Sequence, residues 1–432
     1  MKKTKFTALL LAAGMLLPIL GGCAAGENPV GGDGSDTEEP VFVDYSASGL
    51  GSASPAESAE MSKEFVQASS AFGFELLGKT AQSGNMMISP VSVLYALGMT
   101  SLGAAGNTRT QMEKTLFGGI SVEDAAKYFR GFADTLPDSE KAKVTIANSI
   151  WLNQLQGRFS VNAEFLSRNT SYYGADVFGL PFNTEALERV NGWISDKTDK
   201  MIPQMLDDIA PDALMMLVNT VLFDAKWRTE YTQYQVSDQD FTSYDGTVTK
   251  RETLSSSEYG YFELGKGAGF LKPYAEKYSF VGILPNEGED VFKYAQSIDG
   301  KAFVDAVTGA SRDKVLVRIP SFTFDSSASL EGILAEMGMS DAFSGSKADF
   351  SAMGECADGG NIHISRVLHK TRIELTRSGT KAAAATVVEM KATSAAPTAK
   401  PKQIYLDRPF VFAIVENETG LPLFCGVVSE LK

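Results

Sequence analysis

Histidine is scarce in this chain: only two of its 432 residues are histidines, His363 and His369. A hydrolase needs a nucleophile with a neighbouring base, and neither histidine lies in a motif that supplies such a pair. The scarcity disfavours a surface hydrolase, so we expect no catalytic residue and no enzymatic activity. We interpret His363 as a strand residue without a special role.

Positive charge is also in short supply. The chain has 39 Lys and Arg residues against 53 Asp and Glu residues, which gives a net charge of −14. Binding to phosphate backbones needs clustered Lys and Arg, so nucleic acid is not expected as a partner, and no basic stripe suggests a sulfated polysaccharide. A hydrophobic content of 44% is ordinary for a soluble globular protein with a substantial core.

Cysteine occurs only three times, as Cys23, Cys356 and Cys425. Cys425 lies in the apolar run LPLFCGVV and is predicted to be a buried small hydrophobe. Cys356 lies in a Gly-rich loop. Their spacing matches no metal site, so we expect no metal and no cofactor. A disulfide between Cys356 and Cys425 stays open, although two free thiols are the favoured interpretation.

The chain lacks an apolar run long enough to indicate a membrane span. Residues 6–20 form a short apolar stretch behind a basic start, which is the pattern of a signal peptide. The next segment, LGGC at residues 20–23, resembles the lipobox of bacterial lipoproteins, in which Cys23 would carry the lipid. An ordinary secretory signal is the alternative. We predict a signal peptide over residues 1–22 and a mature protein outside the cytoplasmic membrane, either lipid-anchored to a bacterial membrane or cell surface or secreted.

The next stretch, residues 23–58, consists mainly of Gly, Ser, Ala, Pro and acidic residues, with few apolar anchors apart from residues 41–43. Such a composition cannot bury enough surface to fold and is typical of a flexible tether. About 35 residues of such a coil have a root-mean-square span of roughly 30–35 Å. We therefore predict a lipidated cysteine with a flexible tether over residues 23–58 and a folded domain over residues 59–432.

From residue 60 onward, helical and strand patterns interleave without a repeat or a linker-like break. The spacing of apolar residues predicts helices over residues 65–80, 91–102 and 330–337. Apolar runs rich in β-branched residues, or alternating ones, predict strands over residues 144–151, 214–223, 241–254, 261–264, 279–284, 315–324, 361–375 and 410–415. Helices concentrate in the first half and strands in the second, which predicts one large α+β domain.

The segment GTKAAAATVVEMKAT, residues 379–393, alternates like a strand but is flanked like a loop. Its even-numbered positions carry no charge, and its odd-numbered positions hold all three charges, on Lys381, Glu389 and Lys391. Such alternation is typical of a strand with one buried face. The glycine that opens it and the AAPTAKP that follows are typical of an exposed loop. We interpret the segment as a strand that has not yet joined a sheet.

Seven segments, in the same order, resemble motifs of the serpin family. The first three are NMMISPVSVLYALGMTSLGAAGNT at residues 85–108, NGWISDKTDKMI at 191–202 and LVNTVLFDAKW at 217–227. The others are GMSDAFSGSKADF at 338–350, ISRVLHKTRIEL at 364–375, the hinge-like GTKAAAAT at 379–386 and DRPFVF at 407–412. The resemblance covers nearly all of the chain beyond the predicted tether. One departure is Lys200-Met201, where the family usually has Gly-Lys.

The resemblance implies the serpin fold, with helices packed around a large central β-sheet plus smaller sheets and an exposed reactive-centre loop. It also implies a metastable suicide substrate that inhibits serine-type, and also cysteine-type, proteases. The protease cleaves the loop, forms an acyl-enzyme and is trapped when the loop inserts into the central sheet. The small, Ala-rich hinge favours this function over the alternative, a non-inhibitory serpin-fold binding protein. We expect a monomer.

The resemblance assigns roles to particular residues. The hinge comprises Gly379, Thr380, Lys381, Ala382, Ala383, Ala384, Ala385 and Thr386. A buried polar latch under the centre of the sheet comprises Ser89, Ser92, Asn219 and His369, and hydrogen bonding satisfies these four. Trp227 packs where the loop first enters the sheet. A charge at Thr380 or Ala382 should stall insertion, because burying an unpaired charge costs about several kcal/mol.

Three positions near the hinge depart from the family pattern. Many members pair a Glu two residues before the hinge Gly with a Lys that follows a Leu-Pro on a neighbouring strand. Here the two positions hold Arg377 and Ser321, so that ion pair is not expected. Lys381 replaces the usual hinge Glu, and we expect it to be tolerated because it falls on the solvent face of the inserted strand.

The family's usual distance from the hinge Gly places the scissile bond at Thr393–Ser394. A Thr before the bond suits elastase-like and subtilisin-like proteases with small primary pockets. Lys391–Ala392, two residues earlier, is the alternative and would suit trypsin-like proteases. We therefore expect target proteases as partners, with the membrane contacted only through the N-terminal lipid.

Overall fold

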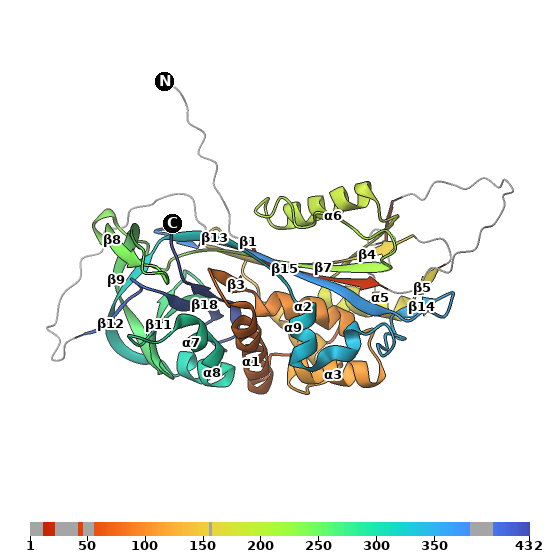
Figure 1. Cartoon of the computed structure of the whole chain (residues 1–432), viewed down its shortest axis with the longest axis horizontal. Coiled ribbons are helices and arrows are strands. Elements are labelled where there is room, and N and C mark those ends of the chain that lie inside the picture. The colour runs from red at the N-terminus through yellow and green to blue at the C-terminus, as the bar shows by residue number, and fades with distance from the viewer. Residues whose placement is uncertain (1–11, 22–41, 46–55, 155–157, 381–400) are drawn as a thin grey trace, which may run out of the picture.

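The structure, a computed structural model, describes residues 12–21, 42–45, 56–154, 158–380 and 401–432. Within these residues, helices pack around two large β-sheets, and a two-stranded sheet lies at one end of the molecule (Figure 1). The prediction of one α+β domain built around a large central sheet is confirmed. Among the described residues, no helix is long and apolar enough to cross a membrane.

The central sheet has eight strands. In spatial order they are β13 (Phe322–Ser329), β15 (His363–Thr376), β1 (Ala12–Gly21) with β16 (Gly379–Thr380), β7 (Met215–Lys226), β4 (Ala142–Asn153), β6 (Asp176–Leu180) and β2 (Val43–Asp44). All neighbouring pairs are antiparallel except β4 and β6. Strand β7 is buried along nearly its whole length because side chains cover it on both faces of the sheet.

A space between β7 and β15, here called the slot, is filled by two separate segments of chain. At the end of the slot where β7 and β15 finish, β16 pairs with both strands. Further from that end, β1 pairs antiparallel with earlier residues of the same two strands. The sequence predicts residues 1–22 as a signal peptide, and β1 lies in the second half of that segment. Both segments that occupy the slot therefore run antiparallel to its two edges.

The second sheet has nine strands and packs against the upper part of the central sheet. Its order is β17 (Lys402–Tyr405), β12 (Ser311–Pro320), β9 (Val248–Leu264), β10 (Gly267–Pro273), β11 (Tyr278–Pro285), β18 (Phe410–Glu416), β19 (Pro422–Val428) and β3 (Met86–Ile88), with β8 (Val236–Thr242) paired to β9. The small third sheet joins β14 (Gly354–Cys356) to β5 (Phe159–Val161). Every residue of β19 is buried, so the C-terminal strands form part of the core.

Helices cover both faces of the central sheet. They are α1 (Lys63–Thr80), α2 (Pro90–Ser101), α3 (Gly106–Phe117), α4 (Val122–Ala133), α5 (Ala163–Tyr173), α6 (Thr184–Lys197), α7 (Val291–Ser297), α8 (Gly300–Thr308) and α9 (Glu331–Leu334). Short turns of 3-10 or π helix follow at Gln233–Gln235, Ala335–Met339 and Ser340–Phe343. Figure 1 shows α6 on one face of the sheet and α2 on the opposite face. All residues of α2 are buried, because it lies between the sheet and the other helices.

The structure corrects three element boundaries. The predicted strand over residues 241–254 is two strands, because Ser243 donates to the Thr247 carbonyl in a turn where Gly246 has φ +85°. The predicted strand over residues 315–324 is also two: β12 ends at Pro320 and β13 pairs with a different sheet. The helix predicted over residues 330–337 holds only α9 before it distorts toward Gly338, which has φ +126°.

Part of the predicted tether packs against the edge of the central sheet. Val43 pairs with Gly179 of β6, and the Phe42 ring lies 5.8 Å from that of Phe178. The Arg189 guanidinium lies over the Phe42 ring, 4.3 Å from its centre. The tether prediction for residues 23–58 does not anticipate this contact, which follows from the few apolar anchors in the segment.

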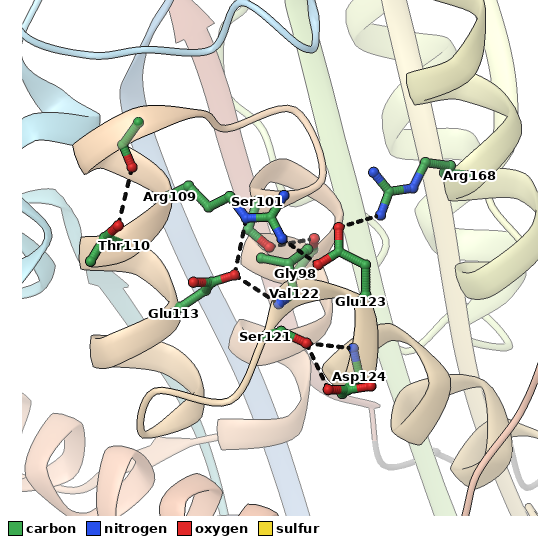
Figure 2. Close-up of polar contacts among 11 residues, drawn as sticks. Gly98, Ser101, Arg109, Thr110, Glu113, Ser121, Val122, Glu123, Asp124 and Arg168 are labelled. Atoms are coloured by element: carbon green, nitrogen blue, oxygen red, sulfur yellow. Dashed lines mark hydrogen bonds and ion pairs between the residues drawn. The ribbon is translucent and has the colours of Figure 1, made fainter.

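An ion-pair cluster joins α3, α4 and α5 on the helical side of the molecule (Figure 2). The Glu123 carboxylate accepts hydrogen bonds from Arg109 and, at 3.0 Å, from Arg168. Glu113 accepts from Arg109 Nε at 3.0 Å and from the backbone N–H of Val122, also at 3.0 Å. Burial would raise the pKa of Glu123, but the hydrogen bonds from Arg168 and Arg109 outweigh it and hold that pKa below its ordinary 4.5.

Candidate functional site

The hinge begins inside the central sheet. Gly379 lies in a row between Lys226 of β7 and Thr376 of β15, and Thr380 occupies the next row. Gly379 has φ +150°, and a Cβ at this position would lie 2.2 Å from the carbonyl oxygen of Ala225. Only glycine can approach β7 this closely. The first two hinge residues therefore already have the backbone pairing of an inserted strand.

Aromatic side chains surround the point where the hinge enters the sheet. Thr380 is fully buried, and its hydroxyl shares a hydrogen bond with the Tyr274 hydroxyl. The Trp227 ring stacks on Tyr274 at 4.4 Å and 6°, and its Nε1 donates to the Thr376 carbonyl at 2.9 Å. Burial raises the pKa of Tyr274, so its hydroxyl stays neutral. Trp227 thus lies beside Thr376 and Tyr274, and its role in loop entry stays a prediction.

A buried ion pair lies beside the same aromatic cluster. Lys272 Nζ contacts Glu258 Oε1 at 2.8 Å, and the two side chains are only 3% and 12% exposed. The ammonium group lies 4.6 Å from the centre of the Tyr231 ring, and it donates to the Thr229 carbonyl at 3.2 Å. Ser256 donates to the same Glu258 oxygen at 2.6 Å. These bonds offset the desolvation that makes buried charges expensive.

Hydrogen bonds connect the four predicted latch residues in one series, from His369 through Ser89 and Ser92 to Asn219. Each of the four residues is at least 98% buried. Ser89 caps α2 by accepting from the Ser92 N–H at 3.2 Å, and its own N–H donates to His369 Nε2 at 3.0 Å. The Ser92 hydroxyl donates to Asn219 Oδ1 at 2.5 Å. His369 Nε2 accepts a hydrogen bond, as expected for a satisfied structural histidine. Whether these contacts latch the sheet stays a prediction.

Asn148, which the sequence analysis did not single out, extends the latch. Its Oδ1 accepts from Asn219 Nδ2 at 2.7 Å, and its Nδ2 donates to the Tyr173 carbonyl at 2.7 Å. Asn148 and Asn219 are also partners across β4 and β7. A signal was present in the sequence, since each Asn stands in a predicted strand that is rich in apolar residues. Their pairing register was not predictable without the fold.

Asn219 and His369 face each other across the slot. In the present structure Leu16 of β1 lies between them and pairs with both. Any strand that enters the slot must therefore pass between these two polar residues. Their hydrogen bonds to α2 and β4 leave both side chains satisfied while the slot is occupied.

The two residues at the positions of the usual family ion pair are not partners. Arg377 is exposed, and its carbonyl accepts from the Tyr231 N–H at 3.3 Å. Ser321 instead donates its hydroxyl to Glu252 at 2.9 Å.

The structure divides the two cysteines of the folded domain. Cys425 is free and buried, and burial raises the pKa of its thiol. Cys356 is disulfide-bonded, which corrects the expectation of two free thiols. A disulfide between Cys356 and Cys425, which the sequence left open, is therefore excluded.

Several predicted residues fall outside the described residues. They are the rest of the hinge from Lys381 to Thr386, both candidate bonds at Lys391–Ala392 and Thr393–Ser394, and the lipid attachment residue Cys23. Among the described residues, no group of three or more His, Cys, Asp or Glu side chains is placed to hold a metal ion.

Comparisons with known proteins agree with the fold described above. A family model described as "Serpin (serine protease inhibitor)" matches residues 67–431. An uncharacterized serpin-like protein of Thermococcus kodakarensis is 29% identical over 99% of both chains. Leukocyte elastase inhibitor A of Mus musculus is 30% identical over 82% of this chain and 95% of its own. The crystal structure of a thermophilic serpin, tengpin, in the native state is 37% identical, with a TM-score of 0.82 over 91% of this chain and 100% of its own.

Proposed function

Because the chain belongs to the serpin family, we propose that it inhibits serine-type proteases, and also cysteine-type proteases, as a suicide substrate. A target protease cleaves the reactive loop and forms an acyl-enzyme. The freed loop then inserts into the slot between β7 and β15 and carries the protease with it. Trapping succeeds when insertion is faster than hydrolysis of the acyl-enzyme.

The seated hinge is the observation that carries this proposal. Gly379 and Thr380 pair with both edges of the slot, so insertion extends an existing strand instead of starting a new one. The slot runs along the 12 residues of β7, which is roughly 40 Å at about 3.3 Å per residue. Sliding the loop along this length would move an attached protease from one end of the sheet to the other.

A small-pocket protease is the favoured target class. Thr393 would occupy the primary pocket of an elastase-like or subtilisin-like enzyme, whereas Lys391 would occupy that of a trypsin-like enzyme. The mouse and human relatives named leukocyte elastase inhibitors support the first class. Mass spectrometry of the small C-terminal fragment released by elastase or by trypsin identifies the bond. Cleavage at neither bond would contradict both assignments.

A gel assay tests inhibition directly. The chain is mixed with elastase, subtilisin or trypsin, boiled in detergent and separated by size. An inhibitor gives a band that contains both proteins, because the acyl bond survives denaturation. A chain that is only cleaved would be a non-inhibitory binding protein, and a chain that turns over substrate alone would be a hydrolase.

We propose that export delivers this inhibitor to a bacterial membrane or cell surface. Residues 1–22 would be the signal peptide, Cys23 the lipid attachment point and residues 23–58 the tether of a monomer. The LGGC sequence and the polar composition that follows it support this proposal. Labelling with a radioactive fatty acid should mark the chain in a bacterial host and should fail to mark a Cys23→Ala variant.

A further inference from the structure

The segment at residues 42–45, here called the clasp, extends one edge of the central sheet. Its strand β2 pairs antiparallel with β6, with Val43 opposite Gly179. Beyond β2, the Tyr45 N–H donates to the Val177 carbonyl at 2.9 Å. An edge strand presents unpaired backbone groups, and the clasp satisfies part of that row on β6. Residues of the predicted tether are therefore built into the sheet.

Phe42 is the side chain that anchors the clasp. Its ring lies 5.8 Å from the Phe178 ring of β6, and the Phe178 ring lies 4.4 Å from that of Trp151 in β4. The Arg189 guanidinium of α6 lies over the Phe42 ring. Stacked rings and a cation over a ring both stabilise contacts of this kind. The sheet and α6 therefore both contribute to the seat of Phe42.

Gly179 leaves room for the second aromatic ring of the clasp. A Cβ at residue 179 would lie 2.8 Å from Cε2 of Tyr45, closer than side chains approach each other in folded proteins. Gly179 is the only glycine of β6, and its neighbours Phe178 and Leu180 are large. The edge strand is therefore open at the one position that faces Tyr45.

The clasp lies at the end of the central sheet that is farther from the hinge. Gly179 is in register with Leu152 of β4, and Leu152 pairs with Met215, the first residue of β7. The hinge enters at the opposite end, where Gly379 pairs with Lys226, the last residue of β7. The length of β7, roughly 40 Å at about 3.3 Å per residue, therefore separates the clasp from the hinge.

These two ends of the sheet are also two ends of the molecule. Figure 1 shows β8, β9 and β12 at one end and β5 and β14 at the other. The described chain stops at Thr380 before the reactive loop and resumes at residue 401, just before β17, which pairs with β12. Both flanks of the loop therefore lie at the end opposite to the clasp.

A second contact holds the predicted tether between the clasp and the first helix. The Ala59 N–H donates to the Lys127 carbonyl of α4 at 3.1 Å. The Glu57 carboxylate contacts the Lys127 ammonium at 2.8 Å. If the clasp is released, the tether therefore still joins the domain at α4, and its length grows to that of the whole predicted tether.

We propose that the clasp orients the anchored protein so that its reactive end points away from the membrane. This inference rests on the proposed lipid anchor and extends it. Only 18 residues, 24–41, separate Cys23 from Phe42. As the coil that the sequence predicts, they have a root-mean-square span of roughly 21–25 Å. A domain held this close to a surface by one end turns its other end toward the medium, where a protease meets the reactive loop first.

Energy transfer from the protein to a labelled membrane tests the orientation. The lipidated chain from a bacterial host is placed on phosphatidylcholine vesicles that carry an acceptor dye. A donor dye is introduced through an unnatural amino acid at Glu355 of β14 or at Tyr234 just before β8, both exposed positions. Transfer should be about twofold more efficient from residue 355, because the coil keeps the clasp end within roughly 25 Å of the surface.

Release of the clasp should remove most of that difference. Phe42→Ser deletes the anchoring ring and should bring the ratio of the two transfer efficiencies more than halfway to one. Arg189→Gln leaves the tether sequence unchanged and should shift the ratio in the same direction by less. Lys127→Met is the matched control, because it removes the contact with Glu57 but keeps the clasp. If Phe42→Ser leaves the ratio unchanged, or if Lys127→Met shifts it equally, the proposal is wrong.

A second way of anchoring separates failure of this proposal from failure of the proposed lipid anchor. A chain without residues 1–22 receives a hexahistidine extension in front of residue 23 and is bound to vesicles that contain a nickel-chelating lipid. An expected ratio in this arm, with no vesicle binding by the chain from the bacterial host, would support the clasp and overturn the lipid anchor alone. Equal transfer from residues 355 and 234 on vesicles that bind the protein would overturn the orientation.

Discussion

Thr380 shows how one side chain serves both the native and the inserted state. It is already buried, and its hydroxyl is bonded to Tyr274. Thr380→Glu should convert the inhibitor into a substrate, because the carboxylate would have to be buried at a cost of about several kcal/mol. The ratio of complex to cleaved chain on a gel measures the effect. Thr380→Val should keep most activity, and equal complex formation by Thr380→Glu would contradict the hinge assignment.

The buried pair Lys272–Glu258 should contribute strongly to stability. Lys272→Met leaves a nearly buried carboxylate without its partner and should lower the free energy of unfolding by about 3–5 kcal/mol. Urea unfolding followed by fluorescence measures this. The double variant Lys272→Met/Glu258→Leu should recover much of the loss, since it leaves no unpaired charge. A double variant as unstable as the single one would show that the charges are not coupled.

The Glu123 cluster gives a prediction about acid stability. Its folded-state pKa lies below 4.5, so its contribution is fully present above that value and is lost as the pH falls through the folded pKa. Glu123→Gln should cost about 1 kcal/mol at pH 7, a modest value because solvent screens this partly exposed carboxylate. Urea unfolding at pH 7 and pH 3 should show the difference from wild type shrinking in acid. A difference that grows in acid would contradict the pairing.

At the residue scale, family motifs placed together side chains that lie far apart in the sequence. The resemblance groups Ser89, Ser92, Asn219 and His369, and all four are buried, while their role as a latch stays a prediction. Lys272 was missed, because its partner lies on another strand. A signal was available: Phe270, Lys272 and Tyr274 alternate in one register, and all three are buried.

At the scale of elements, β1 and the reactive loop would use the same rows of the slot. A chain that keeps β1 in place should be cleaved more often than it traps, because the loop must first displace a paired strand. Deleting residues 1–22 should therefore lower the amount of inhibitor needed per protease, measured by titration of elastase activity. Pro18 lacks an N–H, so β1 should be the weaker occupant. Identical titrations for both chains would show that β1 does not compete.

Element prediction failed where long-range pairing decided the outcome. The turn at Gly246 divides a run that alternates well enough to be one strand, and Pro320 separates two strands that belong to different sheets. The apolar segment that forms β1 is predicted from the sequence as part of a signal peptide. Its strand conformation depends on β7 and β15, which lie far along the chain. Local patterns contain no information about those two strands.

At the scale of the whole molecule, the proposed mechanism requires that the native state is not the most stable one. Cleavage of the loop should raise the thermal midpoint sharply, because the inserted loop adds a full strand to the central sheet. Scanning calorimetry before and after limited proteolysis measures the change. The control is cleavage after Thr380→Glu, which should leave the midpoint nearly unchanged. An unchanged midpoint in the wild-type chain would contradict insertion.

The position of β15 near the end of the chain determines how long synthesis takes to complete the slot. The slot has only one edge until residue 376 has been made, and at about 5–20 residues per second that takes roughly 20–75 s. If the export machinery binds residues 1–22 during that interval, β1 cannot occupy the slot, because β15 has not yet been made. If residues 1–22 are not bound in time, β1 competes with the reactive loop for the completed slot. The rate of export, rather than the affinity of β1 for the slot, would then determine what fraction of the protein is an active inhibitor.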